Sequence, residues 1–177
     1  MRMAFKKGWL SVAVGILRQE LDSMVRIIFL RNQPDSQQRV RLLRMAVSGE
    51  AWSLPTPRGN LMRVTDRQMV DFANDLHGWS KMVYKFGCNF IHLSDCHDYH
   101  ARDPFAALPD DERLSIAQYL RQYHQGNASA DSTFEEISAY FPKVLEKISA
   151  NLEHELRGLE HDPDLRTNAQ DSHSIEA

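Results

Sequence analysis

The chain has 177 residues, 42% of them hydrophobic and 25% charged, with a formal net charge of −3 at pH 7. Its length predicts one domain with its own core, and its composition excludes a fibrous repeat or a largely disordered chain. The slightly negative net charge excludes a protein that binds nucleic acid over a broad basic face. A local basic patch is compatible with this net charge.

The cysteines and the apolar runs indicate the compartment. Cys88 and Cys96 would lie about 12 Å apart on one helix, too far for a disulfide, so we expect reduced thiols and a cytoplasmic protein. No stretch reaches the roughly 18 uncharged apolar residues of a membrane span. The apolar run after Lys7 resembles a signal peptide, but it continues in helical phase into charged residues. We therefore expect a first core helix and no contact with a membrane.

The first third of the chain predicts two helices and a loop. Apolar residues recur at spacings of three and four between Phe5 and Arg31, which indicates one long amphipathic helix. Ser36 can cap a second, arginine-rich helix that stops near Gly49. Two prolines and a glycine within residues 50–64 exclude a helix there and predict a loop or a short hairpin.

A long third helix is predicted next. Thr65 and Gln68 form a capping-box pattern at its start, and the helix should end between His97 and Ala101, before Asp103 and the following proline. The apolar residues that keep helical spacing along it are Met69, Phe72, Leu76, Trp79, Val83, Phe86 and Phe90.

Two more helical segments complete the prediction. A fourth helix should start near Pro109 and stop by Gly126. Ser132 and Thr133, each followed three residues later by glutamate, mark another helix start. Pro142 must interrupt or kink any helix that passes through it, and helical apolar spacing continues to about residue 159. These elements predict an all-α fold, an antiparallel bundle of about five helices over residues 1–162. The first and third helices would form the long antiparallel pair, and residues 163–177 a disordered tail.

The residues best suited to chemistry gather between Lys81 and His100. At 100° per residue, Lys85 and His92 share one helix face, and Asn89 lies at its edge. A cation that steadies a phosphate and an imidazole that moves a proton are the two functions needed for metal-free RNA cleavage. In the alternative interpretation Lys85 is only solvated and His92 packs against another helix.

This arrangement resembles the HEPN superfamily, small all-helical domains of prokaryotic toxin, abortive-infection and other defence systems. Its signature is an arginine, four to six further residues and a histidine, late in a long helix; here Lys85 stands in place of the arginine and Phe86 follows it. The resemblance implies a homodimer with two copies of the motif helix across a cleft, an RNA substrate and a partner or antitoxin protein. It also implies roles for three residues. His92 would be the general acid or base, Lys85 would stabilise the phosphate, and Asn89 would orient one of them, with the ribose 2′-hydroxyl as nucleophile and no metal.

The sequence contains two further candidate sites. His92, Cys96 and His100 follow one helix row and could share a zinc ion, but His97 points about 100° away from Cys96, so we expect neither a bound metal nor a cofactor. A cluster of arginines, Arg39, Arg41 and Arg44, with Arg58, Arg63 and Arg67 beyond the loop, could contact RNA phosphates or an acidic partner, or could be a solvated helix face.

On the first helix, Asp22 has an arginine four residues away on each side, Arg18 and Arg26, which predicts surface ion pairs. Glu20 would be costly to bury unless a partner such as Lys85 met it. The leading hypothesis is thus a HEPN-like ribonuclease. A non-catalytic helical interaction module is the first alternative, and a metal-binding bundle is the second.

Overall fold

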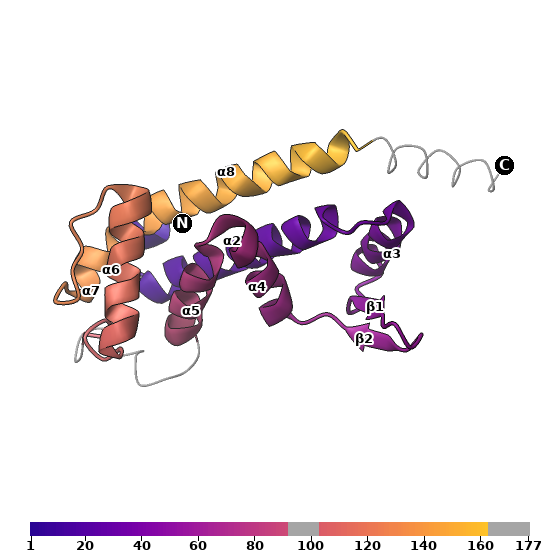
Figure 1. Ribbon diagram of the computed structural model, residues 1–177. Coiled ribbons are helices and arrows are strands. Elements are labelled where there is room, and N and C mark those ends of the chain that lie inside the picture. Colours follow the sequence, from indigo (N-terminus) through magenta and orange to yellow (C-terminus); the bar gives the residue numbers. More distant parts are fainter. Residues whose placement is uncertain (92–102, 163–177) are drawn as a thin grey trace.

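The computed structural model of the chain describes residues 1–91 and 103–162. These residues form helices and one small two-stranded sheet, arranged around the long helix α2 (Figure 1). The elements are α1 (Arg2–Lys6), α2 (Leu10–Arg31), α3 (Ser36–Val47), β1 (Ser53–Pro55), β2 (Leu61–Arg63), α4 (Asp66–His77), α5 (Ser80–Ile91), α6 (Asp110–His124), α7 (Phe134–Ser138) and α8 (Phe141–Glu160). The prediction of a mainly helical fold is confirmed, but a bundle of about five helices without a sheet is wrong.

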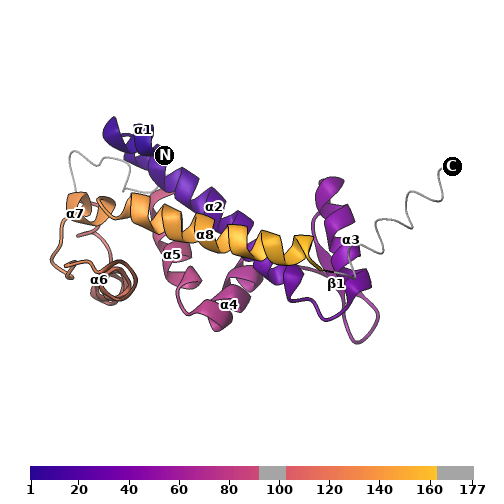
Figure 2. The ribbon, with the colours of Figure 1, turned by 90° about the horizontal axis from the view of Figure 1, so that it is seen from above.

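Helix α2 is covered on two sides, by α8 and by the α4–α5 segment (Figures 1 and 2). Contacts between α2 and α8 advance in the same direction along both helices. Ser149 Oγ donates a hydrogen bond to Glu20, and farther along both helices Arg31 pairs with Glu155 at 2.8 Å. The two longest helices therefore run parallel, which the antiparallel-bundle prediction did not include.

The α4–α5 segment runs antiparallel to α2. Near the start of α4, Asp66 accepts a hydrogen bond from Arg26 at 3.0 Å, and the rings of Phe72 and Phe29 meet edge to face. Toward the end of α5, Gly87 lies against Arg18, much earlier in α2. From α4 to α5 the chain thus returns along α2 in the opposite direction, which agrees in part with the antiparallel packing expected of the first and third predicted helices.

The predicted single third helix is wrong, because the chain turns at Gly78. This glycine has φ of 74°, a left-handed conformation that few other residues adopt, and its N–H donates to the carbonyl oxygen of Asn74. The Asn74 side chain then accepts a hydrogen bond from the backbone N–H of Lys81, and the Ser80 hydroxyl donates to the carbonyl of Val70. These bonds end α4 and start α5 at a fixed angle.

Local signals set the other boundaries. Gly8, with φ of 71°, separates α1 from α2, so the first long helix begins at Leu10 rather than Phe5. Asp35, not Ser36, caps α3, because its carboxylate accepts from the N–H of Gln37. The capping box at Thr65 is confirmed, and of the two alternatives before α7 the one at Thr133 is used. Pro142 lies in the first turn of α8, where a missing N–H costs nothing.

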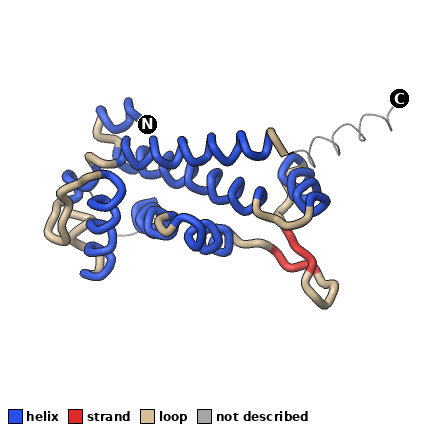
Figure 3. The backbone as a smooth tube through the Cα atoms, turned by 45° about the horizontal axis from the view of Figure 1, so that its top comes forward, coloured by secondary structure: helices blue, strands red, loops and turns tan. Residues whose placement is uncertain are grey.

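The β1–β2 hairpin projects beside α3 at one end of the molecule (Figure 3). Ser53 pairs with Arg63 and Pro55 with Leu61 in antiparallel register. The turn is closed by a hydrogen bond of 2.7 Å from the N–H of Thr56 to the carbonyl of Asn60. Of the two conformations predicted for residues 50–64, the hairpin is thus the one present.

Two glycines provide a matched test of the packing. A Cβ added at Gly126 would lie 2.8 Å from the ring of Tyr140. The hydroxyl of Tyr140 accepts a hydrogen bond from the N–H of Asn127. A Cβ added at Gly15 in α2 would have no atom within 4 Å. We expect Gly126→Ala to lower the free energy of unfolding by about 1–3 kcal/mol. Gly15→Ala should raise it by about 0.5–1 kcal/mol, because alanine is the better helix former. Urea denaturation of both variants measures these changes, and equal effects would contradict the packing described for Tyr140.

Candidate functional site

Lys85 lies on the outer face of α5. Val83 and Phe86 of the same helix are buried, whereas the side chain of Lys85 is 54% exposed. At Gly87 the helix approaches α2 so closely that an added Cβ would stand 2.9 Å from Cδ of Arg18. Gly87 lies on the flank of α5 that faces α2, whereas Lys85 lies on an exposed flank. The ammonium group of Lys85 is therefore accessible to a ligand.

One carboxylate lies beside this lysine, and a second lines the same cavity. Its Nζ lies 3.9 Å from Oε1 of Glu112, in the first turn of α6. Lys85, Asp111, Glu112 and Ser115 line a small cavity of about 40 Å³, and apolar atoms of α5 and α6 complete its wall. A phosphate that approaches Lys85 would therefore have to compete with the carboxylate of Glu112.

The other predicted catalytic residues are placed only in part. Asn89 belongs to the last turn of α5, and His92 lies outside the described residues, as do Cys96, His97 and His100. The proposed zinc ligands therefore cannot be placed. Within residues 1–91 and 103–162, no three His, Cys, Asp or Glu side chains gather closely enough to hold a metal ion.

The predicted RNA-binding arginines of α3 divide into two kinds. Arg39 is 8% exposed, donates to the carbonyl of Gln33 at 2.7 Å and pairs with Asp162 at 3.1 Å. Its guanidinium therefore joins α3 to the end of α8 and is occupied within the fold. Arg41 and Arg44 are exposed on the same helix and remain accessible to a ligand.

Further exposed arginines lie close to α3. The hairpin and the start of α4 contribute Arg58, Arg63 and Arg67, and a cavity of about 290 Å³ between the hairpin, α2 and α4 is lined by Arg26 and Arg63. We call the five exposed side chains of Arg41, Arg44, Arg58, Arg63 and Arg67 the arginine surface. Helix α3 and the hairpin, which carry four of these arginines, lie at the end of the molecule opposite α6, whereas α4, which carries Arg67, lies between them and α5 (Figure 1). The structure therefore does not bring these four arginines together with Lys85.

The polar residues of α2 have partners of their own. Arg18 and Asp22 form the predicted ion pair, and the Arg18 guanidinium also covers the Tyr84 ring at 3.9 Å. Arg26 pairs with Asp66 rather than with Asp22. Glu20 accepts from Ser149 of α8, and no bond joins it to Lys85 among the described residues.

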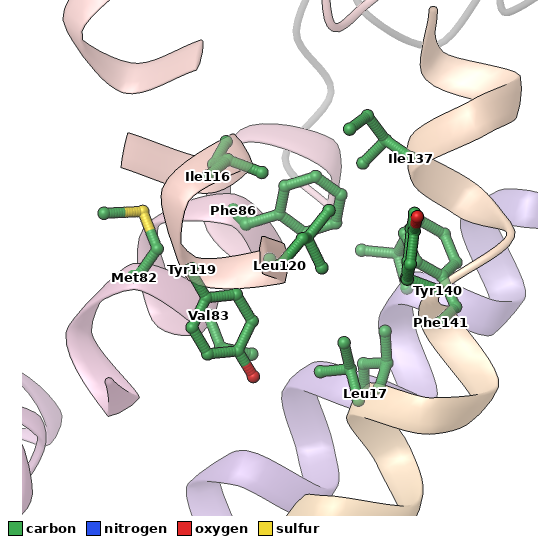
Figure 4. A pocket seen from close by; sticks show the side chains of 13 residues that line it. Leu17, Met82, Val83, Phe86, Ile116, Tyr119, Leu120, Ile137, Tyr140 and Phe141 are labelled. Atoms are coloured by element: carbon green, nitrogen blue, oxygen red, sulfur yellow. The ribbon is translucent and has the colours of Figure 1, made fainter. Parts of the chain in front are cut away.

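An apolar pocket lies where α2, α5, α6 and α8 meet (Figure 4). Its volume is about 30 Å³, and its lining includes Leu17, Phe86, Leu120 and Phe141. The pocket has room for no more than one or two small molecules of the size of water, and its apolar lining offers such a molecule few hydrogen-bond partners. It is therefore a packing gap in the core rather than a substrate site.

The sequence reasoning missed a group of titratable and aromatic side chains between α6 and α8. The Lys147 ammonium lies 3.5 Å from the ring centroid of Tyr123, 4.8 Å from that of Trp79 and 5.9 Å from that of Tyr119. The Tyr119 hydroxyl and Nε2 of His124 share a hydrogen bond of 3.0 Å. We call these five residues the lysine cage. The spacing of Tyr119, Tyr123 and His124 along α6 was the only signal in the sequence, because Trp79 and Lys147 come from distant segments.

Burial shifts the titration of the lysine cage. Desolvation lowers the pKa of Lys147 to about 8 and raises the pKa of the Tyr119 hydroxyl, which therefore keeps its proton at neutral pH. Burial also lowers the pKa of His124, and the positive charges of Lys147 and Lys143 lower it further. His124 is therefore neutral at pH 7, and its hydrogen bond with Tyr119 does not require a charge.

Comparison of the chain with protein-family models, with curated proteins and with solved structures finds no match. In the described part of the chain, no helix has the length and apolar character needed to cross a membrane. The function must therefore be argued from the residues themselves.

The lowered pKa of His124 predicts a pH dependence of stability. The unfolded chain takes up a proton near the ordinary value of 6.5, while the folded protein resists protonation, so the unfolded state binds more protons as the pH falls below 6.5. The free energy of unfolding should therefore decrease below that pH. His124→Gln should reduce this decrease, and His154→Gln, which changes an exposed histidine of α8, should not. Urea denaturation at pH values from about one unit below to about one unit above 6.5 measures the effect.

Proposed function

We propose that the protein is a HEPN-like endoribonuclease of a prokaryotic defence or toxin–antitoxin system, which cleaves RNA without a metal ion. Lys85 would stabilise the phosphate, His92 would transfer the proton and Asn89 would orient one of them. The exposed position of Lys85 on α5 is the observation that carries this proposal. A buried lysine could not reach a phosphate, whereas this ammonium lies beside a cavity, at 3.9 Å from Oε1 of Glu112.

The reaction needs a base, an acid and a stabilised phosphorane, and no oxidant or cofactor. The ribose 2′-oxygen attacks the adjacent phosphorus, the bond from phosphorus to the 5′-oxygen breaks, and a 2′,3′-cyclic phosphate and a 5′-hydroxyl result. An imidazole with a pKa near 6.5 can accept or donate the proton near neutral pH. A lysine ammonium carries a positive charge and offsets the charge that develops on the phosphate.

The arginine surface supports an extended RNA substrate. Arg41 and Arg44 are exposed on α3, and the hairpin adds Arg58 and Arg63. These cations lie at the other end of the molecule from Lys85, so they would hold RNA away from the cleavage point and contribute to binding rather than to the chemical step. Their contribution should weaken as the salt concentration rises.

Cleavage of single-stranded RNA in the presence of EDTA tests the proposal. We expect His92→Ala to lower the rate by about 10²-fold to 10⁴-fold, the usual contribution of a general acid or base. Lys85→Ala should lower it by about 10²-fold, whereas Lys85→Arg should preserve or increase it, because a guanidinium can hold a phosphate through two hydrogen bonds. The proposal fails if the wild-type protein and Lys85→Arg leave the RNA intact.

Lys81 provides the matched control. It is also about half exposed on α5, one turn before Lys85, but its Nζ pairs with Asp71 at 2.9 Å. Lys81→Ala should therefore leave cleavage unchanged within about twofold. Glu112→Gln should increase activity, because it removes the carboxylate that competes for Lys85. An RNA with 2′-deoxyribose at the cleaved position should remain intact.

The proposal also predicts a homodimer joined near α5. One copy of Lys85 with two carboxylates nearby offers little net positive charge, so a second copy of the motif helix would supply the missing cation. Light scattering at micromolar concentration should give about twice the 20.4 kDa chain mass. A monomer that still cleaves RNA would show that one motif is sufficient.

A non-catalytic interaction module is the second candidate function. Large apolar side chains at the hairpin end are exposed, namely Val47 of α3 with Leu61 and Met62 of β2. A partner protein that covered these residues would bury apolar surface without any need for His92. Protein that lacks RNA cleavage in every variant above would favour this function.

A further inference from the structure

The cavity between the hairpin, α2 and α4 is much larger than the cavities beside α5. Its volume of about 290 Å³ is close to the lower end of the range for small-molecule sites, which is about 300–1,000 Å³. Two cations, Arg26 and Arg63, and the indole of Trp52 belong to its wall, together with Thr65 and Asp66 at the start of α4. A cavity of this size with a charged wall could hold a small polar molecule.

Trp52 supplies a hydrogen-bond donor that the protein does not use. The residue is 7% exposed, and its indole Nε1 is buried without a hydrogen-bond partner among the described residues. Buried indole N–H groups usually have a partner, because a buried donor without one is costly. The ring stacks on that of Phe29 at 6.3 Å, and the Trp52 carbonyl accepts a hydrogen bond of 2.8 Å from the N–H of Val64. The unused donor thus belongs to a firmly held residue of the cavity wall.

The two arginines give the wall a net positive charge. The Arg26 guanidinium lies 5.9 Å from the centroid of the Trp52 ring and donates a hydrogen bond of 3.0 Å to Asp66. Arg26 therefore balances the carboxylate of Asp66, and its other N–H groups remain available. In the part of the chain that the structure describes, no ion pair or side-chain hydrogen bond involves Arg63. Its charge is left for a ligand.

The first turn of α4 adds a third positive group. The hydroxyl of Thr65 accepts from the N–H of Gln68, and the Gln68 side chain accepts from the N–H of Thr65. The N–H of Asp66, at the first helical position, has no carbonyl partner within the helix. The positive end of the helix dipole also favours an anion there. Three elements that are distant in the sequence therefore turn positive charge and unused donors toward one cavity.

From this convergence we propose that the cavity is a binding site for a small phosphate monoester. Arg63 would donate to the phosphate through two hydrogen bonds, and the N–H groups of Asp66 and Trp52 would donate to its other oxygens. The cavity is larger than a phosphate group alone, and Val64 and Met69 in its wall offer apolar contact to an organic group. Free nucleotides and the phosphorylated end of an RNA share this chemistry. The inference does not depend on the proposed ribonuclease activity, because binding is measured without cleavage.

Isothermal titration calorimetry with 5′-AMP tests the proposal, with adenosine as the control that lacks the phosphate. We expect 5′-AMP to bind and adenosine not to bind. Arg63→Ala should weaken the binding by about 10-fold to 100-fold, the usual effect of the loss of hydrogen bonds to a charged group. Arg58→Ala is the matched control, because Arg58 is exposed in the turn of the same hairpin but is not part of the wall. It should change the affinity by less than about twofold.

Two oligoribonucleotides that differ only in the 5′ end distinguish the sources of the phosphate. If the 5′-phosphorylated form binds more tightly than both 5′-AMP and the 5′-hydroxyl form, the site is one for RNA ends. If 5′-AMP binds more tightly than the 5′-phosphorylated form, the site is one for free nucleotides. Both results support a site for a phosphate monoester.

The indole N–H resonance of Trp52 gives a second measurement, which a general attraction to surface charge would not change. In NMR spectra, 5′-AMP should shift this resonance, assigned with Trp52→Phe, and leave that of the exposed Trp9 in place. The proposal is overturned if 5′-AMP does not bind at millimolar concentration or if adenosine binds equally well. Equal losses of affinity in Arg63→Ala and Arg58→Ala, or an unchanged Trp52 resonance at saturation, would also overturn it.

Discussion

The packing of α2 between two layers of helix constrains every other described element. Leu21, Met24, Ile28 and Leu30 are fully buried along it, and burial of each such side chain contributes about 1.5–3 kcal/mol. Because α8 covers one side and α4 with α5 the other, few positions of α2 are left for solvent. The polar residues that remain are used for contacts between helices, such as Arg26 with Asp66 and Glu20 with Ser149.

Most helix positions could be predicted from the sequence, because apolar spacing and capping residues are local. The third helix shows the limit. Leu76 and Trp79 keep the spacing of a continuous helix across Gly78, yet Leu76 is exposed and Trp79 is buried, because the turn at Gly78 reorients the chain. Apolar spacing reports which face is buried but not which helix covers it. The parallel pairing of α2 with α8, which lie at opposite ends of the chain, therefore could not be derived.

The candidate site shows the same division between local and distant information. The exposed position of Lys85 agrees with its place opposite Val83 and Phe86, which helical phase could predict. The burial of Arg39 depends on Asp162, and the lysine cage combines side chains of α6 and α8 with Trp79. These residues come from segments far apart in the chain, so no spacing pattern in the sequence could predict their contacts. His92 lies outside the described part of the chain, and its proposed role follows from its helical spacing from Lys85 in the sequence.

The parallel pairing of α2 and α8 also has a consequence for synthesis on the ribosome. The apolar side of α2 that α8 covers remains exposed to solvent until the ribosome has translated α3 to α7. This delay is roughly ten seconds at ordinary elongation rates. During that interval the nascent chain exposes a long apolar helix face, which is a risk for aggregation and a binding surface for chaperones. Contacts between such distant segments also slow folding, so α8, which is made after all the other described helices, is expected to complete the core.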